Sequence, residues 1–257
     1  MSGPSAPRRP LAPCLRPTLL VAVVLVAACS RDARLATRCR AGEIAVCAEL
    51  GDMYAYGRGV ARSPARAAEM YERSCEGGMA DVCNTLGEVY EKTGALDGGI
   101  ARAAGYYQKA CEGRSSAGCL NLGLFYAARE DYARAVELYE RACSDGWAPA
   151  CHQLAATYEQ GDGVARDVPR AVSLYTQACD GEHADSCAAL GSLYASGATV
   201  PRNVQLALRF YGRAFKLYSD ACDAGAQSDC TGRDHLRARM VGLSAGTPAA
   251  NRPAPVR

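Results

Sequence analysis

Apolar residues recur along this chain at the spacing of a helix surface. Five segments share one pattern, in which a cysteine is followed by leucine three residues later, a small residue four later and tyrosine seven later. These segments begin at Cys47, Cys83, Cys119, Cys151 and Cys187. Positions 0, 3, 4 and 7 lie on one face of an α-helix. The pattern therefore predicts a short helix in each segment, helix A, whose small residue lets a neighbouring helix approach closely.

A second helix, helix B, is predicted after each helix A. In five segments alanine and tyrosine stand four residues apart and so share a face. These pairs are Ala67/Tyr71, Ala103/Tyr107, Ala135/Tyr139, Ala171/Tyr175 and Ala207/Tyr211. Glycine-containing stretches such as YGRGV and QGDGV favour a loop between helix A and helix B, the A–B loop. Ser63-Pro64 is typical of an N-cap followed by proline at the first helical position. The tyrosines recur in phase, which favours a place in the core.

The cysteines give the period of these helix pairs. Twelve of the 14 cysteines form Cys-x7-Cys pairs, whose first members are 36, 36, 32, 36 and 43 residues apart. A period near 36 with helical patterning is typical of a helix-pair solenoid. We therefore expect an all-α fold, an α/α superhelical solenoid of about five helix-pair repeats over residues 38–241 with a capping C-terminal helix. The shortest repeat lacks four residues of the A–B loop, and the longest has seven more in helix B.

Each Cys-x7-Cys pair predicts a disulfide between the end of one helix B and the start of the next helix A. In a continuous helix the two cysteines would lie about 12 Å apart, whereas a disulfide needs Cα atoms about 4.4–6.8 Å apart. The chain must therefore reverse between them in a B–A turn. Glycines in all six intervals favour this reversal: Gly42, Gly113, Gly118, Gly146, Gly181 and Gly225, with two more in EGGMADV. The predicted pairs are Cys39/Cys47, Cys75/Cys83, Cys111/Cys119, Cys143/Cys151, Cys179/Cys187 and Cys222/Cys230.

Metal binding is the competing interpretation of the cysteines. The sequence lacks the tight Cys-x2-Cys spacing of zinc sites, and neighbouring pairs lie one repeat apart along the chain. It also lacks the Cys-x-x-Cys-His motif of haem attachment. We therefore expect neither a metal nor another cofactor.

The N-terminal segment predicts export. Residues 1–17 carry arginines and no acid, and an apolar run, TLLVAVVLVAA, follows at 18–28. This arrangement is typical of a signal peptide, and the run is shorter than the roughly 20 residues of a membrane span. The sequence VAAC resembles a bacterial lipobox, which implies cleavage after residue 28 and lipidation of Cys29. An ordinary signal peptide cleaved nearby, with Cys29 incidental, is the alternative.

These features suggest a domain organisation and a location. We expect a lipoprotein signal peptide at 1–28, a linker at 29–37, the solenoid at 38–241 and a disordered tail at 242–257, where Pro, Ala and Gly are frequent. The expected location is the bacterial cell envelope, through a lipid anchor at Cys29, with the outer membrane facing the periplasm favoured by Ser30. Paired cysteines suit such an oxidising compartment. The formal net charge of +2 gives no electrostatic argument for a nucleic acid partner.

Three segments carry a resemblance to a known family. LGDMYAYGRGV, LGSLYASGATV and RAAGYYQKACEGRSSAGCLNLGLFY resemble Sel-1-like repeats, which are relatives of the tetratricopeptide repeat. The regular Cys-x7-Cys spacing resembles the cysteine-rich Hcp-type subgroup. The resemblance implies a curved α/α superhelix with a concave binding face and one disulfide per repeat. We therefore expect a scaffold that binds an envelope protein or peptide in the concave face.

The Hcp-type resemblance also implies an alternative function, weak β-lactamase or penicillin-binding hydrolysis. A serine enzyme of that type needs Ser-x-x-Lys and Ser-Asp-Asn elements, and the sequence has neither. One Lys-Thr-Gly occurs, starting at Lys92, where other repeats have their A–B loop. The histidines His152, His183 and His235 share no motif and are expected to be solvated or packed. No catalytic residue is therefore assigned, and binding is favoured over catalysis.

The charges divide unevenly between the two kinds of connection. The seven residues inside each cysteine pair include ten acids, opposed by Arg40 and Arg114: Glu43, Glu76, Asp81, Glu112, Asp145, Asp180, Glu182, Asp185, Asp223 and Asp229. Around the A–B loops lie basic residues mixed with acids: Arg58, Arg62, Arg66, Arg102, Arg129, Arg134, Arg166, Arg170 and Arg202. Acids near helix N-termini favour the helix dipole, which explains only part of this pattern. One hypothesis is an acidic edge that steers basic partners.

Overall fold

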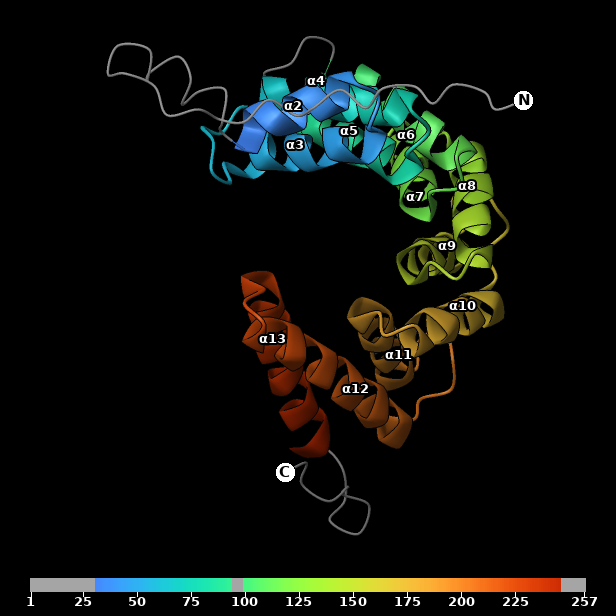
Figure 1. Cartoon of the computed structure of the whole chain (residues 1–257). Helices are drawn as coiled ribbons and strands as arrows, with labels where there is room; N and C mark the ends of the chain where they lie inside the picture. The colour runs from blue at the N-terminus through green and yellow to red at the C-terminus, as the bar shows by residue number, and fades with distance from the viewer. Residues whose placement is uncertain (1–30, 94–98, 246–257) are drawn as a thin grey trace, which may run out of the picture. The chain divides into compact units, whose positions relative to one another are not determined.

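The computed structural model describes residues 31–93 and 99–245 (Figure 1). The predicted signal peptide, Cys29 and the end of the tail lie outside the described residues. The described helices are α2 (Arg31–Arg40), α3 (Ile44–Tyr56), α4 (Pro64–Glu76), α5 (Ala80–Thr93), α6 (Gly99–Glu112), α7 (Ser116–Ala127), α8 (Tyr132–Ser144), α9 (Ala148–Gln160), α10 (Val168–Asp180), α11 (Ala184–Ser196), α12 (Val204–Asp223) and α13 (Gln227–Ala245). The chain forms two compact units, residues 1–78 and 79–257.

The expected all-α solenoid of helix pairs is confirmed. The A helices are α3, α5, α7, α9 and α11, and each packs against the B helix that follows it. Helix α13 follows the last B helix as a capping element. Within the second unit, α7 contacts α5 and α9 in addition to its neighbours in the chain. In this unit α7, α9 and α11 lie on the inner side of the bend, and α8 and α10 on the outer side (Figure 1). No helix within 31–93 or 99–245 is both long and apolar enough to cross a bilayer.

Tyrosine rings from the B helices pack on the small residues of the A helices. A Cβ atom at Gly123 would lie 2.5 Å from Cε1 of Tyr139, too close for the ring to keep its place. The same contact joins Gly51 to Tyr71, Gly87 to Tyr107 and Gly191 to Tyr211. All these tyrosines are buried, as is Tyr175 of the fourth helix pair. The predicted close approach and the predicted core position of the tyrosines are both confirmed.

Disulfides join the helices across the B–A turns. The structure contains Cys39–Cys47, Cys111–Cys119, Cys143–Cys151, Cys179–Cys187 and Cys222–Cys230, with Cα–Cα distances of 4.4–4.8 Å. Cys75 and Cys83 are disulfide-bonded as well. Each described bridge closes an interval in which the chain reverses direction, because the two bridged cysteines lie on successive helices or at their ends.

In each B–A turn the chain reverses at the same position, whether or not that position holds a glycine. The third residue after the first cysteine is left-handed in each turn, with φ of 94° at Gly42 and 84° at Gly146. In two turns that position holds Arg114, with φ 69°, or Glu182, with φ 62°. The expectation that nearby Gly113, Gly118 and Gly181 provide the reversal is therefore wrong. At Gly118 a Cβ would meet Ala110 and the backbone of Cys111, so this glycine permits a close approach between helices.

The longest and the shortest repeat differ from the others where the sequence predicted, in helix B and in the A–B loop respectively. Helix α12 has 20 residues, whereas α10 has 13, so the extra seven residues extend a B helix. Only residues 128–131 separate α7 from α8, which is the short A–B loop.

The start of the fold differs from expectation. Residues 31–37, expected to be part of a linker, belong to α2. Leu35 of this helix is buried in a cluster with Val46, Leu50 and Met53. An apolar face that packs on α3 therefore makes this segment helical.

Replacing Gly123 with leucine tests the packing of tyrosine on glycine. We expect the free energy of unfolding to fall by about 1–3 kcal/mol, because the added side chain overpacks the contact with Tyr139. Gly105 is the matched control, since it also lies in a helix and a Cβ there would meet nothing within 4 Å. Gly105→Leu is expected to be neutral or stabilising, because leucine favours helix more than glycine does. Urea unfolding measures both; equal losses would contradict the packing argument.

Candidate binding surface

In the second unit the inner face lies on α7, α9 and α11, on the side of the bend opposite α8 and α10 (Figure 1). Polar side chains join two pairs of helices near it. Asn121 Nδ2 of α7 donates to Asn84 Oδ1 of α5 at 2.8 Å. Arg239 Nη1 of α13 donates to Ser192 Oγ of α11 at 2.9 Å. Hydrogen bonds thus join α5 to α7 and α11 to α13.

Small and amide side chains complete the inner face. Gln153 on α9 occupies the position that Asn121 occupies on α7, two residues after the cysteine, and both are half-buried. Ala156 of α9 and Ala189 of α11 are half-buried as well. Leu124 of α7 is 39% exposed. Short side chains allow the backbone of a ligand to come close, and amides can both donate to and accept from peptide groups. The surface is suited to an extended polypeptide.

The structure brings together two histidines that the sequence did not connect. His152 Nδ1 on α9 and His183 Nδ1 at the start of α11 each lie 2.9 Å from Ser186 Oγ. The two imidazole rings are 4.8 Å apart between centroids, and Tyr175 packs against His152 at 5.3 Å. The expectation of packed histidines holds for this pair, but their mutual contact was missed.

Burial keeps this histidine cluster neutral. Burial, with a smaller effect of nearby His183, lowers the pKa of His152 to about 4, although Asp185 opposes the shift. Burial also lowers the pKa of His183, again opposed by Asp185. One hydroxyl can donate a hydrogen bond to only one imidazole, so the other neutral imidazole must donate its Nδ1–H to Ser186 Oγ.

The cluster is not arranged as a catalytic nucleophile. Ser186 is fully buried, so its hydroxyl cannot reach a substrate. Lys92, which begins the Lys-Thr-Gly sequence, donates Nζ to Glu88 one turn earlier on α5 at 2.8 Å. His235 lies on the exposed surface of α13, away from both other histidines in sequence. Over 31–93 and 99–245 there is no group of three His, Cys, Asp or Glu side chains placed to hold a metal.

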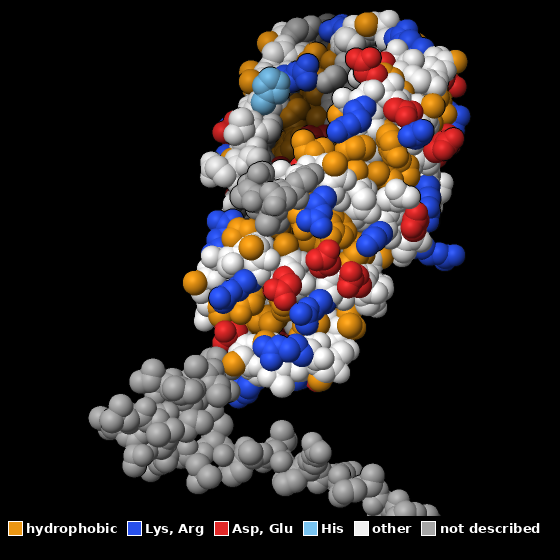
Figure 2. All heavy atoms as spheres, turned by 90° about the horizontal axis from the view of Figure 1, so that it is seen from above, with side chains coloured by type: hydrophobic (Ala, Val, Ile, Leu, Met, Phe, Trp, Pro, Cys, Tyr) orange, Lys and Arg blue, Asp and Glu red, His pale blue; other side chains and the backbone are white. Residues whose placement is uncertain are grey.

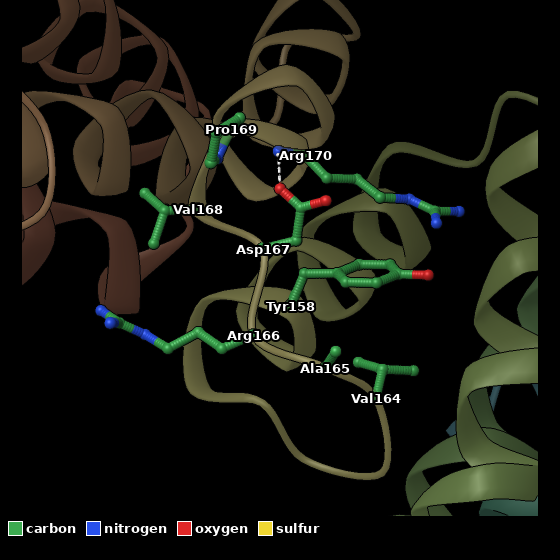
Figure 3. Close-up of a pocket in the computed structure, with 8 residues that line it drawn as sticks. All are labelled: Tyr158, Val164, Ala165, Arg166, Asp167, Val168, Pro169 and Arg170. Carbon is green, nitrogen blue, oxygen red and sulfur yellow. Dashed lines mark hydrogen bonds between the residues drawn. The ribbon is translucent and has the colours of Figure 1, made fainter.

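The arginines near the A–B loops are largely engaged within the fold. A recurring contact places an arginine of helix B over the tyrosine that stands seven residues after the helix-A cysteine: Arg66/Tyr54, Arg102/Tyr90, Arg134/Tyr126 and Arg170/Tyr158. Other loop arginines donate Nε to helix-A carbonyls, as Arg166 does to Glu159 O at 2.8 Å. In the hollow beside this fourth loop, the Asp167 carboxylate accepts from the backbone N–H of Arg170 and caps α10 (Figure 3).

The acids of the B–A turns are also partly neutralised. Arg38 pairs with Glu43 at 2.5 Å, and Arg213 pairs with Asp180 at 2.6 Å. The Tyr218 hydroxyl donates to Asp185. Acidic and basic side chains are interspersed on the face shown in Figure 2. These contacts reduce the charge available to a partner, and an acidic edge that steers basic partners stays a prediction.

Acid is expected to destabilise the second unit through the histidine cluster. Both histidines have a folded-state pKa below the ordinary value of about 6.5, so the unfolded chain binds more protons as the pH falls below that value. Stability is therefore present above about pH 6.5 and lost progressively toward pH 4. We expect His152→Gln to weaken this pH dependence in urea unfolding between pH 7.5 and 5. His235→Gln, on an exposed residue, is the control and is expected to change nothing; equal curves for all three proteins would disprove the assignment.

Comparison with known proteins gives a family and a fold. The model of the family described as Sel1 repeat matches residues 44–79, 86–115, 116–147, 148–183 and 184–225. No curated protein matches the sequence. A crystal structure of a Sel1 repeat protein from Oxalobacter formigenes is 23% identical, covers 85% of this chain and 92% of that one, and has a TM-score of 0.63.

Two further solved structures are similar. The protective antigen c5321 of uropathogenic Escherichia coli, which displays an SLR fold, is 19% identical with a TM-score of 0.63. The match covers 88% of this chain but only 53% of the antigen. Cysteine-rich protein B of Helicobacter pylori is 26% identical with a TM-score of 0.42, over 50% of this chain and 96% of that one.

Proposed function

This chain belongs to the Sel1 repeat family, and we propose that it is an envelope scaffold that binds an extended peptide or protein segment on the inner face of its second unit. Sel1 repeats generally mediate interactions between proteins. The observation that supports this site is that α7, α9 and α11 share the inner side of the bend, with hydrogen bonds that join α5 to α7 and α11 to α13. Repeats that present the same surface at regular intervals suit a long, extended ligand.

The chemistry of the inner face favours a peptide over a small molecule. The half-buried amides of Asn121 and Gln153 can hydrogen-bond to peptide groups, and Arg239 adds a cation at the C-terminal end. The side chains stand on helices tied by disulfides, so little ordering is needed when a ligand binds. Preorganisation of this kind lowers the entropic cost of association.

Gln153→Arg tests the inner face as the binding surface. The larger charged side chain on α9 is expected to block an extended ligand and reduce partner recovery at least tenfold, which corresponds to about 1.4 kcal/mol. Gln108→Arg is the matched control, because it makes the same change at an exposed position of α6, a B helix. The measurement is affinity capture from membranes with quantitative mass spectrometry. Equal loss in both variants, or loss in neither, would refute this assignment.

We also propose that the chain is exported and held in the envelope by a lipid on Cys29. The support lies in the sequence, where VAAC follows an arginine-bearing segment and an apolar run. Lipid on this residue would place the anchor two residues before Arg31, the first described residue of α2. The first unit would then be held close to a membrane, with the inner face of the repeats available to other envelope proteins.

Cys29→Ser tests the anchor. A serine oxygen cannot replace the sulfur that carries the diacylglycerol, so the variant is expected to lose incorporation of labelled fatty acid. It is also expected to move from the membrane fraction to the soluble or uncleaved fraction. Cys14→Ser is the control, because Cys14 precedes the apolar run, and it is expected to keep the label. Retention of label by the Cys29 variant would contradict the proposal.

A further inference from the structure

The first unit contains a groove between α2 and α4 that is floored by α3. Leu50 and Tyr54 form its floor, and arginines from both flanking helices line its sides. The lining residues are Ala36, Cys39, Arg40, Leu50, Tyr54, Arg66, Glu69, Met70 and Arg73. An apolar floor with cationic sides can hold a ligand that has both an aliphatic part and an anionic group.

The second unit shows how a corresponding groove is completed internally. Between α8 and α10, Glu140 Oε1 accepts the hydroxyl of Tyr158 at 3.2 Å and Arg170 Nη2 at 3.0 Å. The Arg170 guanidinium also lies over the Tyr158 ring, 4.2 Å from its centroid. Glu140 of the preceding B helix therefore accepts hydrogen bonds from both Tyr158 and Arg170. Figure 3 shows Tyr158 and Arg170.

The repeat register identifies the matching residues in the first unit. Tyr158 and Tyr54 both stand seven residues after the helix-A cysteine, and Arg170 and Arg66 both stand nine before the next cysteine. Glu140 stands three residues before Cys143. The residue three before Cys39 is Ala36. The first unit thus keeps the tyrosine and the arginine and has a methyl group at the position that Glu140 holds before the fourth helix pair.

The charges around Ala36 are consequently unbalanced. Arg66 lies over Tyr54 at 5.5 Å, as its counterpart does, but has no carboxylate partner among the described residues. Arg73 is paired with Glu69 at 3.2 Å, one turn away on α4, and this is the single acid of the groove. Arg40 adds a third, exposed guanidinium. Three cations therefore face one anion over an apolar floor.

We propose that the α2–α4 groove is a binding site for an acidic peptide, whose glutamate or aspartate carboxylate takes the place of the missing Glu140 equivalent. The carboxylate accepts from the Tyr54 hydroxyl and the Arg66 guanidinium. An adjacent apolar side chain of the peptide rests on Leu50 and Met70. A peptide carboxylate is favoured because the completed groove between α8 and α10 is itself filled by a glutamate side chain. Charge-assisted hydrogen bonds to arginine are among the stronger polar contacts in proteins.

The test supplies the missing carboxylate from the protein. In the disulfide-bonded full chain, Ala36→Glu is expected to fill the site and to weaken binding of a blocked hexapeptide of alternating leucine and glutamate at least tenfold. Thr37→Glu is the matched control, since it adds the same charge at an exposed neighbouring position of α2 outside the groove. Titration calorimetry measures both, and circular dichroism checks that each variant folds.

Three comparisons can overturn the proposal. Equal weakening by Ala36→Glu and Thr37→Glu would show only bulk charge. Equal affinity for the same peptide with glutamine in place of glutamate would show that no carboxylate is recognised. Binding to phosphatidylglycerol vesicles without binding to the glutamate peptide would assign the groove to a membrane surface. Gln153→Arg on the inner face is expected to leave peptide affinity unchanged, which separates this site from the one proposed above.

Discussion

A disulfide between the end of one helix pair and the start of the next holds two Cα atoms 4.4–4.8 Å apart, and the local geometry of each turn follows from that distance. The chain has only seven residues in which to reverse, so one of them must be left-handed. Arg114 and Glu182 adopt this conformation although a side chain disfavours it there. The covalent constraint therefore outweighs the local backbone preference.

Close packing also acts within each helix pair, across the A–B loop. In four pairs the tyrosine ring of helix B meets the glycine of helix A at short range. Gly123 and Tyr139 illustrate the result, in which even one added methyl group would collide with the ring. Helices of 12–14 residues are marginal in isolation, so this packing and the disulfides supply the stability that the helices lack.

Features that depend on spacing within one repeat could be predicted from the sequence. The helix faces, the B–A turns and the extension of α12 all follow from periodicities of a few residues. The cluster of His152, His183 and Ser186 could not be predicted this way, because its members come from successive repeats and meet only after one helix pair is placed on the next. A sequence feature that could have indicated the cluster is the position of each residue relative to a helix-A cysteine. His152 directly follows Cys151, and Ser186 directly precedes Cys187. The helical start at Arg31 was missed because its face holds few apolar residues besides Leu35.

Departures from the repeat are therefore more informative about function than the repeat itself. The arginine stacked on the helix-A tyrosine recurs in four helix pairs, and in two of them it also pairs with a carboxylate of the protein. Where the same arginine and tyrosine remain and the glutamate beside them is replaced by Ala36, structure alone gives no reason to keep an unpaired cation over an apolar floor. A ligand that brings its own carboxylate supplies the reason, since it restores the contacts that Glu140 makes within the protein. Arg134 and Arg170, the counterparts of Arg66 in the third and fourth helix pairs, already have carboxylate partners within the fold.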